Sequence, residues 1–172
     1  MIETERLILR PHRLDDFEAL HAIWTEPDVV RHITGRPSTR AESWDRLSRY
    51  AGQWALLGHG FLAAEEKASG AYVGDIGIGR FERGLGPDFD DFDEAGWILG
   101  PAAQGKGFAT EAMTAILAWF AREKGPRRTV CIVSPENAAS IRVAGKLGYR
   151  PFADRIFPGT EDDMVRLFER IP

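Results

Sequence analysis

The sequence predicts a mixed α/β or α+β fold, in which helices pack against a central sheet. Strand-like and helix-like segments are interleaved in the order β-α-α-β-β-β-α-β-α-β-β. Hydrophobic residues make up 44% of the chain and charged residues 28%, a globular mixture with enough apolar surface for a core. No repeat or low-complexity linker divides the 172 residues, so we expect one domain over residues 1–172.

The first half of the chain predicts three strands and two helices. The strands are residues 6–10, 60–64 and 72–78, the first ended by Pro11 and the last two joined by a turn at 68–70. Asp15 and Asp16 are placed to cap a helix that begins near Phe17. A second helix is expected over residues 40–57. Its predicted buried face consists of Trp44, Leu47, Ala51 and Trp54.

The second half contains the clearest helical pattern. A strand at 95–99 is closed by Gly100 and Pro101, and residues 108–124 then repeat apolar residues on one helical face. Gly125 and Pro126 end that helix. The remaining predicted elements are a strand at 129–133, a helix at 138–147 and strands at 149–152 and 164–168.

Composition excludes several classes of protein. The net charge is −4, and the segment 84–94 alone holds five acids and no base, so no basic nucleic-acid footprint is present. No apolar run is long enough to span a membrane, and the first residues are charged where a signal peptide is apolar. A single cysteine, Cys131, excludes an internal disulfide and a cysteine-based zinc site. We therefore expect a cytoplasmic protein without a metal.

The junction before the helix at 108–124 carries a phosphate-binding pattern. Gly105, Lys106 and Gly107 stand at a helix start, where free backbone N–H groups and the helix dipole attract anions. The Walker pattern fails because Gly107 replaces the hydroxyl residue, and the dinucleotide pattern fails at Thr110. Residues 104–109, Gln-Gly-Lys-Gly-Phe-Ala, match a third pattern, Q/R-x-x-G-x-G/A.

That third pattern is the pyrophosphate loop of the GNAT superfamily of N-acetyltransferases, which the chain resembles over nearly its whole length. Residues 4–11, 73–77, 94–99 and 136–149 also resemble segments of its RimJ/RimL-like branch, in the correct order. The resemblance implies a mixed sheet splayed between its fourth and fifth strands, helices on both faces, and acetyl-coenzyme A in the gap. It does not specify the acceptor.

The resemblance also implies roles for individual residues. The residues expected to bind acetyl-coenzyme A are Ile98, Leu99, Gln104, Gly105, Lys106, Gly107, Phe108, Ala109, Thr110, Asn137, Ser140 and Arg142. Asn137 can instead act only as a helix cap. Ser140 is the expected proton donor to the leaving thiolate, because Ala144 stands where many members have a tyrosine. Glu94 is the first candidate to accept the proton of the amine and Asp75 the second, unless water alone does so.

Three functions remain open at this point. The first is direct transfer of an acetyl group to a primary amine, either a protein N-terminus or a small molecule. Acids and aromatics in residues 88–93 then predict a lip for a cationic amine. The second is an acyl-coenzyme A sensor without turnover, and the third, weaker one is a nucleotide hydrolase. A homodimer is also left open.

Overall fold

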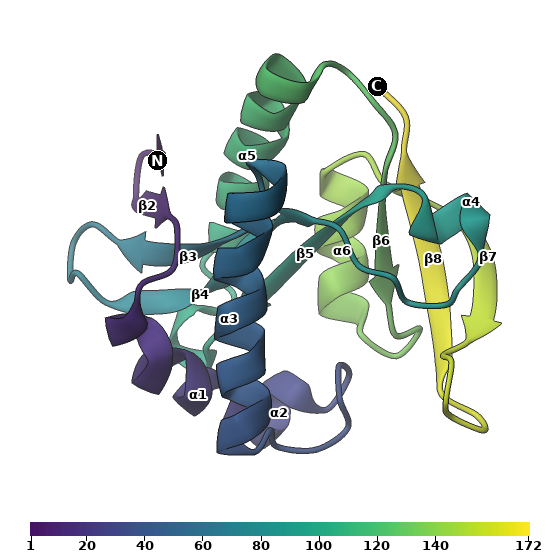
Figure 1. Cartoon of the computed structure of the whole chain (residues 1–172), viewed down its shortest axis with the longest axis horizontal. Coiled ribbons are helices and arrows are strands. Elements are labelled where there is room, and N and C mark those ends of the chain that lie inside the picture. Colours follow the sequence, from purple (N-terminus) through teal and green to yellow (C-terminus); the bar gives the residue numbers. More distant parts are fainter.

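The computed structural model describes all 172 residues and contains one eight-stranded mixed sheet (Figure 1). The strands are β1 (Ile2–Glu3), β2 (Leu7–Arg10), β3 (Phe61–Glu66), β4 (Tyr72–Gly79), β5 (Asp93–Leu99), β6 (Thr129–Val133), β7 (Arg150–Ile156) and β8 (Met164–Arg170). Their order in the sheet is β1-β2-β3-β4-β5-β6-β8-β7. All neighbours are antiparallel except β5 and β6, which are parallel. The predicted mixed fold is confirmed.

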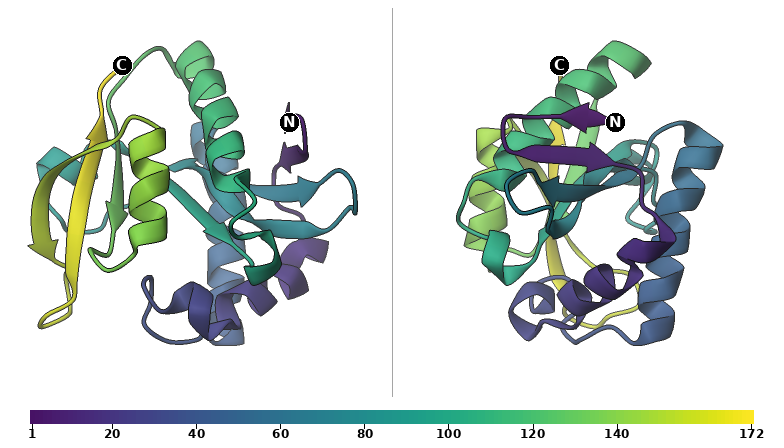
Figure 2. Two further views of the ribbon diagram at one scale, coloured as in Figure 1. Left: turned by 180° about the vertical axis from the view of Figure 1, so that it is seen from behind. Right: turned by 90° about the vertical axis from the view of Figure 1, so that its left-hand side faces the viewer.

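Helices cover both faces of this sheet. They are α1 (Phe17–Thr25), α2 (Pro27–Val30), α3 (Arg40–Leu57), α4 (Pro87–Asp90), α5 (Phe108–Lys124) and α6 (Ala138–Lys146). Short 3₁₀ turns occupy 14–16 and 101–103. Helices α1 and α3 lie on the face seen in Figure 1, and the rear view in Figure 2 shows α5 and α6 on the opposite face. No helix is both long enough and apolar enough to cross a bilayer.

The sheet separates between β5 and β6. These strands are paired only where Asp93 meets Thr129 and Glu94 meets Val130, whereas β5 pairs with β4 along its length. Beyond Glu94 the two strands diverge, as Figure 1 shows. This is the predicted splay between the fourth and fifth strands. The strand labels differ by one because the short β1 was not predicted.

Local sequence signals explain where the long helices begin and end. Thr39 and Glu42 form a reciprocal capping box at the start of α3, and Gly58 ends the helix with a φ of +66°. The predicted bounds of α3, α5 and β6 agree with the structure. The predicted cap of α1 is different, because the Asp16 carboxylate accepts the N–H of Arg13 and ion-pairs with Arg10.

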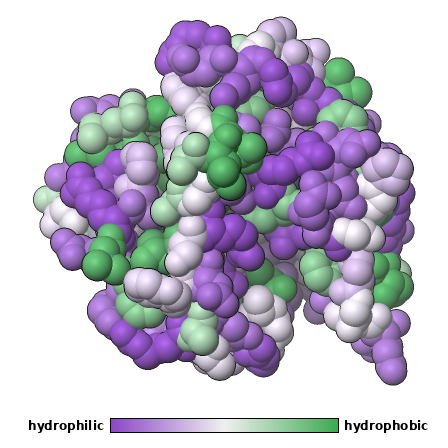
Figure 3. Space-filling view, viewed as in Figure 1, coloured by the Kyte–Doolittle hydropathy of each residue, from purple (hydrophilic) through white to green (hydrophobic).

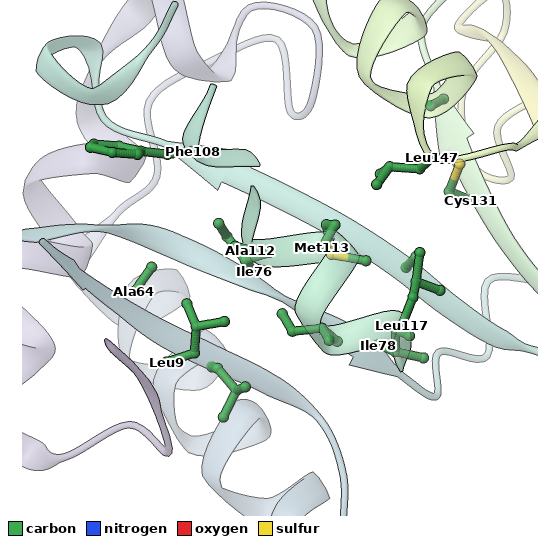
Figure 4. Close-up of a cluster of buried hydrophobic side chains, with 14 of the residues drawn as sticks. Leu9, Ala64, Ile76, Ile78, Phe108, Ala112, Met113, Leu117, Cys131 and Leu147 are labelled. Carbon is green, nitrogen blue, oxygen red and sulfur yellow. The ribbon is translucent and has the colours of Figure 1, made fainter. Parts of the chain in front are cut away.

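The main core lies between α5 and the sheet. Figure 4 shows sheet residues such as Ile76 and Ile78 facing Ala112, Met113 and Leu117 of α5. Ala112 and Met113 are wholly buried. Because α5 is clamped in this way, its first turn is held at a fixed position beside β5.

A smaller core joins α1 and α3 on the other face. It includes Leu20 and Trp24 of α1 and Leu47 and Tyr50 of α3. The predicted buried face of α3 is wrong in part. Leu47 is buried as predicted, but Trp44 is 47% exposed, and the other buried residues are Ser43, Tyr50 and Gln53. The face of α3 toward the sheet is therefore partly polar.

The exposed apolar side chains are scattered. Hydrophobic and hydrophilic residues alternate over the face seen in Figure 3. The most exposed large hydrophobic residues include Leu14, Leu56 and Ile171, which belong to three separate parts of the chain. This face therefore presents no broad apolar surface of the kind that marks a stable interface.

A candidate active site at the splayed strands

Two cavities open where β5 and β6 diverge. The first has a volume of about 790 Å³ and is lined by the end of β5, the loop and first turn of α5, α6, and the segment 28–33. The second has a volume of about 520 Å³ and is lined by α1, α3, β5, β6 and the segment 157–165. Six residues line both cavities: His32, Ile33, Trp97, Ile98, Asn137 and Ser140. A molecule in one cavity can therefore meet a molecule in the other at this junction.

A row of backbone hydrogen-bond donors lines part of the first cavity. No backbone N–H from Gly105 to Thr110 has an acceptor within the chain, and the first bond of the helix runs from Glu111 N to Gly107 O. Such a row at the start of a 17-residue helix has the geometry and charge that suit an anion. Of these residues, Gly105, Gly107, Phe108, Ala109 and Thr110 line the cavity, as predicted for a pyrophosphate loop.

The two glycines permit this backbone path. Gly105 has a φ of +75° and Gly107 a φ of +82°, in the left-handed region that favours glycine. A Cβ on Gly105 would meet nothing within 4 Å, and one on Gly107 would meet only Arg6 at 3.6 Å. The glycines are therefore required by backbone conformation and not by a close contact with another part of the chain.

The loop is anchored from behind by the N-terminal segment. Arg6 donates to the Lys106 carbonyl at 2.9 Å and to the Glu111 carboxylate at 2.7 Å. Glu111 also accepts from the Thr4 hydroxyl at 2.6 Å. The Lys106 residue does not line the first cavity, so its predicted role as a cofactor ligand finds no support in its position.

The main-chain groups of β5 point alternately toward β4 and toward the gap. Gly100 N donates to Val73 O of β4, and a Cβ on Gly74 would lie 2.0 Å from Ile98 O, so the main chain of Ile98 faces β4. Backbone groups alternate along a strand, so the main chain of Trp97 and Leu99 faces the gap. The Leu99 carbonyl indeed accepts from the Gln104 side chain at 3.0 Å. The resemblance implied that both Ile98 and Leu99 bind the co-substrate through their main chain. The direction of the strand keeps Leu99 and corrects Ile98 to Trp97, while Ile98 lines both cavities.

The start of α6 lies across the gap from β5. Asn137 caps this helix, and its Oδ1 accepts the N–H of Ser140 at 3.0 Å. This leaves the amide NH₂ of Asn137 available, so the cap and a ligand bond are compatible. Ser140 lines both cavities, and Arg142 lines the first. Ala144 is wholly buried.

Glu94 lies at the point where β5 leaves β6. It is 4% exposed and lines the second cavity. Both of its oxygens accept from Arg83, at 2.8 and 2.7 Å. Burial alone would lower the pKa of the Arg83 guanidinium, but the Glu94 carboxylate raises it above its ordinary value. Arg83 and Glu94 therefore form a fixed ion pair in the wall of the second cavity.

Asp75 does not occupy a position suited to proton transfer from a substrate. It is wholly buried in β4 and lines neither cavity. Its carboxylate accepts from His12 at 2.8 Å, from Trp24 at 2.9 Å and from the Tyr72 hydroxyl. The prediction that Asp75 is a second candidate base is thus corrected, because its oxygens are saturated by side chains that join β4 to α1 and to the segment before it.

The acidic segment has a structural role in place of the predicted lip. Asp88 pairs with Arg155 of β7 at 2.6 Å, and Asp90 accepts from the backbone N–H of Arg83 and Gly86. Asp93 pairs with His59 at 2.9 Å. None of the acids from Asp88 to Asp93 lines either cavity. A cationic amine therefore gains no attraction from them at the junction.

The sequence analysis missed most of the second cavity. Its basic lining residues are Arg36, Arg46, Arg49 and Arg83. Positions 46, 49, 50 and 53 share one face of α3, and all four side chains are polar. This run of polar residues was the one signal of the cavity wall in the sequence. It was not used, because these positions lay outside the predicted buried face of the helix. His32 and the segment 28–36 carry no periodic pattern, and their contribution to both cavities depends on the fold.

A mixed sheet that splays beside an anion-binding helix start defines the fold class of the acetyl-coenzyme A-dependent acetyltransferases. The family model for the GNAT acetyltransferase domain matches residues 6–150, and the chain belongs to this family. The chain is also 34% identical to a solved structure from Bordetella pertussis described as a GNAT-family acetyltransferase, with 98% of each chain covered and a TM-score of 0.87.

Two further relatives show how far the similarity extends. The uncharacterised N-acetyltransferase YnaD of Bacillus subtilis is 28% identical over 149 residues, which cover 87% of this chain and 82% of YnaD. RimL, a ribosomal L7/L12 α-N-protein acetyltransferase solved with coenzyme A, has a TM-score of 0.77 at 17% identity, over 98% of this chain and 95% of RimL. The likeness to RimL is one of fold.

Proposed function

We propose that the chain transfers an acetyl group from acetyl-coenzyme A directly to a primary amine. The observation that carries this proposal is the continuous path from the free N–H groups of residues 105–110 to a second cavity, through the junction at Ser140. The first cavity suits a long phosphorylated co-substrate, and the second suits a separate acceptor. Both substrates can then be bound at once.

Each part of acetyl-coenzyme A has a matching group in the first cavity. The N–H groups from Gly105 to Thr110 bind the diphosphate. Arg142 and Lys146 line the outer part of the cavity and serve the remaining phosphate. The gap-facing main-chain groups of Trp97 and Leu99 pair with the pantetheine amides, as an added strand would, with the Leu99 carbonyl also accepting from Gln104. The predicted ligands Gln104, Phe108, Ala109 and Asn137 also line this cavity.

The reaction takes place at the junction of the cavities. The neutral amine nitrogen attacks the thioester carbonyl, a C–N bond forms, and the C–S bond breaks. A gap-facing N–H of β5 stabilises the charge that develops on the carbonyl oxygen. Ser140 gives a proton to the departing thiolate and takes up another from water as it does so. Burial raises the pKa of the Cys131 thiol, so this cysteine stays neutral and does not form an acyl-enzyme.

Two residues are placed to receive the proton of the amine. Glu94 lines the second cavity and receives the proton through a water molecule, because Arg83 occupies both of its oxygens. His32 is a second candidate, since it lines both cavities and makes no hydrogen bond within the chain.

Four expectations stay predictions from the sequence: the RimJ/RimL-like branch, the cytoplasmic location, the single-domain assignment and the homodimer.

The experiment that tests the proposal is release of free thiol from acetyl-coenzyme A in the presence of a panel of amines. Binding of coenzyme A is measured in parallel by calorimetry. We expect coenzyme A to bind and thiol to be released only with an acceptor. Tight binding without acceptor-dependent thiol release would instead favour the acyl-coenzyme A sensor.

A further inference from the structure

We infer that the acceptor amine also carries an oxyanion, a carboxylate or a phosphate, which Arg46 and Arg49 bind in the second cavity. This inference rests on the proposed function and names the class of its acceptor. This acceptor class differs from the cationic amine that we predicted from the acidic residues 88–93.

The second cavity has more positive than negative charge. Two of its four arginines are neutralised, since Arg83 pairs with Glu94 and Arg36 pairs with Glu42 at 2.6 Å. Arg46 and Arg49 have no carboxylate within 4.0 Å. The remaining acid among the lining residues is Asp163, which belongs to the loop between β7 and β8. The α3 side of the cavity therefore carries two uncompensated guanidinium groups.

Arg46 is held in place and partly removed from water. Its guanidinium carbon lies 3.4 Å from the ring centroid of Trp24, and its only hydrogen bond within the chain is a long one of 3.4 Å to Ser38. Burial lowers the pKa of Arg46 below its ordinary value. A charge that is desolvated without a counterion is costly, so the geometry is that of a group whose partner is a ligand.

Arg49 extends the same surface. It stands one turn further along α3, and its guanidinium carbon lies 5.6 Å from the ring centroid of Phe81. Guanidinium groups bind carboxylates and phosphates through paired hydrogen bonds, and stacking on aromatic rings fixes their planes. Two such groups, one turn apart, can bind the oxygens of one oxyanion.

The volume of the cavity suits a small acceptor. Its volume is about 520 Å³, and its floor is built of Trp24, Tyr50, Phe61 and Phe81. The oxyanion is bound on the α3 side while the amine reaches the junction beside Ser140. An amino acid or an aminoalkyl phosphate meets both requirements. A polyamine would place a second cation against Arg46 and Arg49, which like-charge repulsion disfavours.

The inference is tested by matched pairs of amines that differ in the oxyanion. L-alanine is compared with L-alaninamide, and O-phosphoethanolamine with ethanolamine; putrescine and a neutral tetrapeptide complete the panel. Binding to the coenzyme A-saturated protein is measured by calorimetry, and thiol release from acetyl-coenzyme A gives kcat/KM. We expect the anionic member of at least one pair to bind about tenfold more tightly or better, since hydrogen bonds to charged groups exceed the free energy of a tenfold change. The pair with the larger ratio tells whether the oxyanion is a carboxylate or a phosphate.

Variants assign the preference to the two arginines. In Arg46→Gln/Arg49→Gln the preference should disappear, while binding of coenzyme A and of the neutral amines stays within about twofold. Arg122→Gln is the matched control, because Arg122 is exposed on α5 and pairs only with Glu123. A thermal melt establishes that each variant is folded, and Arg46→Lys should restore part of the preference.

Each outcome separates this inference from the proposed function. Equal binding of charged and neutral members, tighter binding of putrescine or the tetrapeptide, or a preference that survives the double substitution would overturn the inference. Arginine-dependent binding of the anionic amines without thiol release would uphold the inference and refute the proposed function. Thiol release with no preference between the charged and neutral amines of a pair would refute this inference and uphold the proposed function.

Discussion

Nε2 of His12 lies 2.8 Å from Oδ1 of Asp75, and both side chains are wholly buried. Trp24 and Tyr72 donate to the same carboxylate, so three aromatic or imidazole side chains meet on Asp75. Burial and the Asp75 carboxylate raise the pKa of Tyr72, which keeps its hydroxyl protonated as a donor. The cluster joins β4 to α1 behind the second cavity, and Trp24 in turn supports Arg46.

Asp75→Ala should therefore act on stability. Removing the carboxylate leaves three buried donors without an acceptor, and we expect the free energy of unfolding to fall by about 3 kcal/mol. Urea denaturation followed by circular dichroism measures this change. Asp91→Ala is the control, because Asp91 is largely exposed and lies 3.9 Å from its nearest cationic partner. A stable Asp75→Ala protein without acetyl transfer would show instead that Asp75 takes part in the chemistry.

Gly107→Glu should abolish binding of coenzyme A. The φ of +82° strains any side chain at this position, and a carboxylate there repels the diphosphate from the free N–H groups. We expect the dissociation constant measured by calorimetry to rise by about a hundredfold or more. Gly70→Glu is the matched control, because Gly70 has a φ of +70° in the turn between β3 and β4, outside both cavities. Normal binding by Gly107→Glu would mean that the diphosphate lies elsewhere.

The sequence predicted this loop well because the signal is local. Two glycines, a helix start and the preceding strand are contiguous, so the sequence indicated free N–H groups at this junction, and the resemblance to the family added the pyrophosphate. Helical spacing and the stop at Gly125 are similarly local, which is why the bounds of α3 and α5 were predicted correctly.

Residues whose partners are distant in the sequence were predicted poorly. Asp75 resembled a candidate base until the fold placed His12 and Trp24 against it. The acidic segment was expected to attract an amine, but Arg155, 67 positions from Asp88, neutralises part of it. The second cavity takes its walls from segments between residues 24 and 165, and no local pattern could bring these together.

The stability that Glu111 contributes beside the pyrophosphate loop should depend on pH. Burial would raise the pKa of this carboxyl group, but hydrogen bonds from Thr4 and Arg6 outweigh it and lower the pKa below its ordinary value of 4.5. The stability that these bonds contribute is therefore fully present above pH 4.5, and it is lost as the pH falls through the lowered pKa. Glu111→Gln should make unfolding less dependent on pH in this acidic range.

The same substitution should also weaken binding of coenzyme A. Glu111 orients Arg6, which in turn holds the Lys106 carbonyl behind the loop. We expect a loss of about threefold to tenfold at pH 7, measured by calorimetry, because a single positioning bond is removed. Glu123→Gln, on the exposed side of α5, should change neither property. If both variants behaved alike, Glu111 would not position the loop.

Ser140→Ala should lower kcat by about tenfold to a hundredfold and leave the affinity for acetyl-coenzyme A unchanged. The Asn137 cap survives, because it accepts the backbone N–H of residue 140. A thiol has an ordinary pKa of about 8.5, so the defect should shrink as the assay pH rises above that value. Ser69→Ala, in the turn between β3 and β4, is the control. A defect that did not vary with pH would argue against proton donation by Ser140.

Glu94→Gln and His32→Gln distinguish the two candidate proton acceptors. If Glu94 receives the proton through water, Glu94→Gln should lower kcat by about a hundredfold, while His32→Gln costs less than about tenfold. Glu94 also fixes Arg83, so Arg83→Gln is measured beside it. Loss of that ion pair alone should raise KM for the acceptor and lower kcat less than Glu94→Gln does. The opposite ranking, with the larger loss of kcat in His32→Gln, would assign the proton to the histidine at the junction of the two cavities.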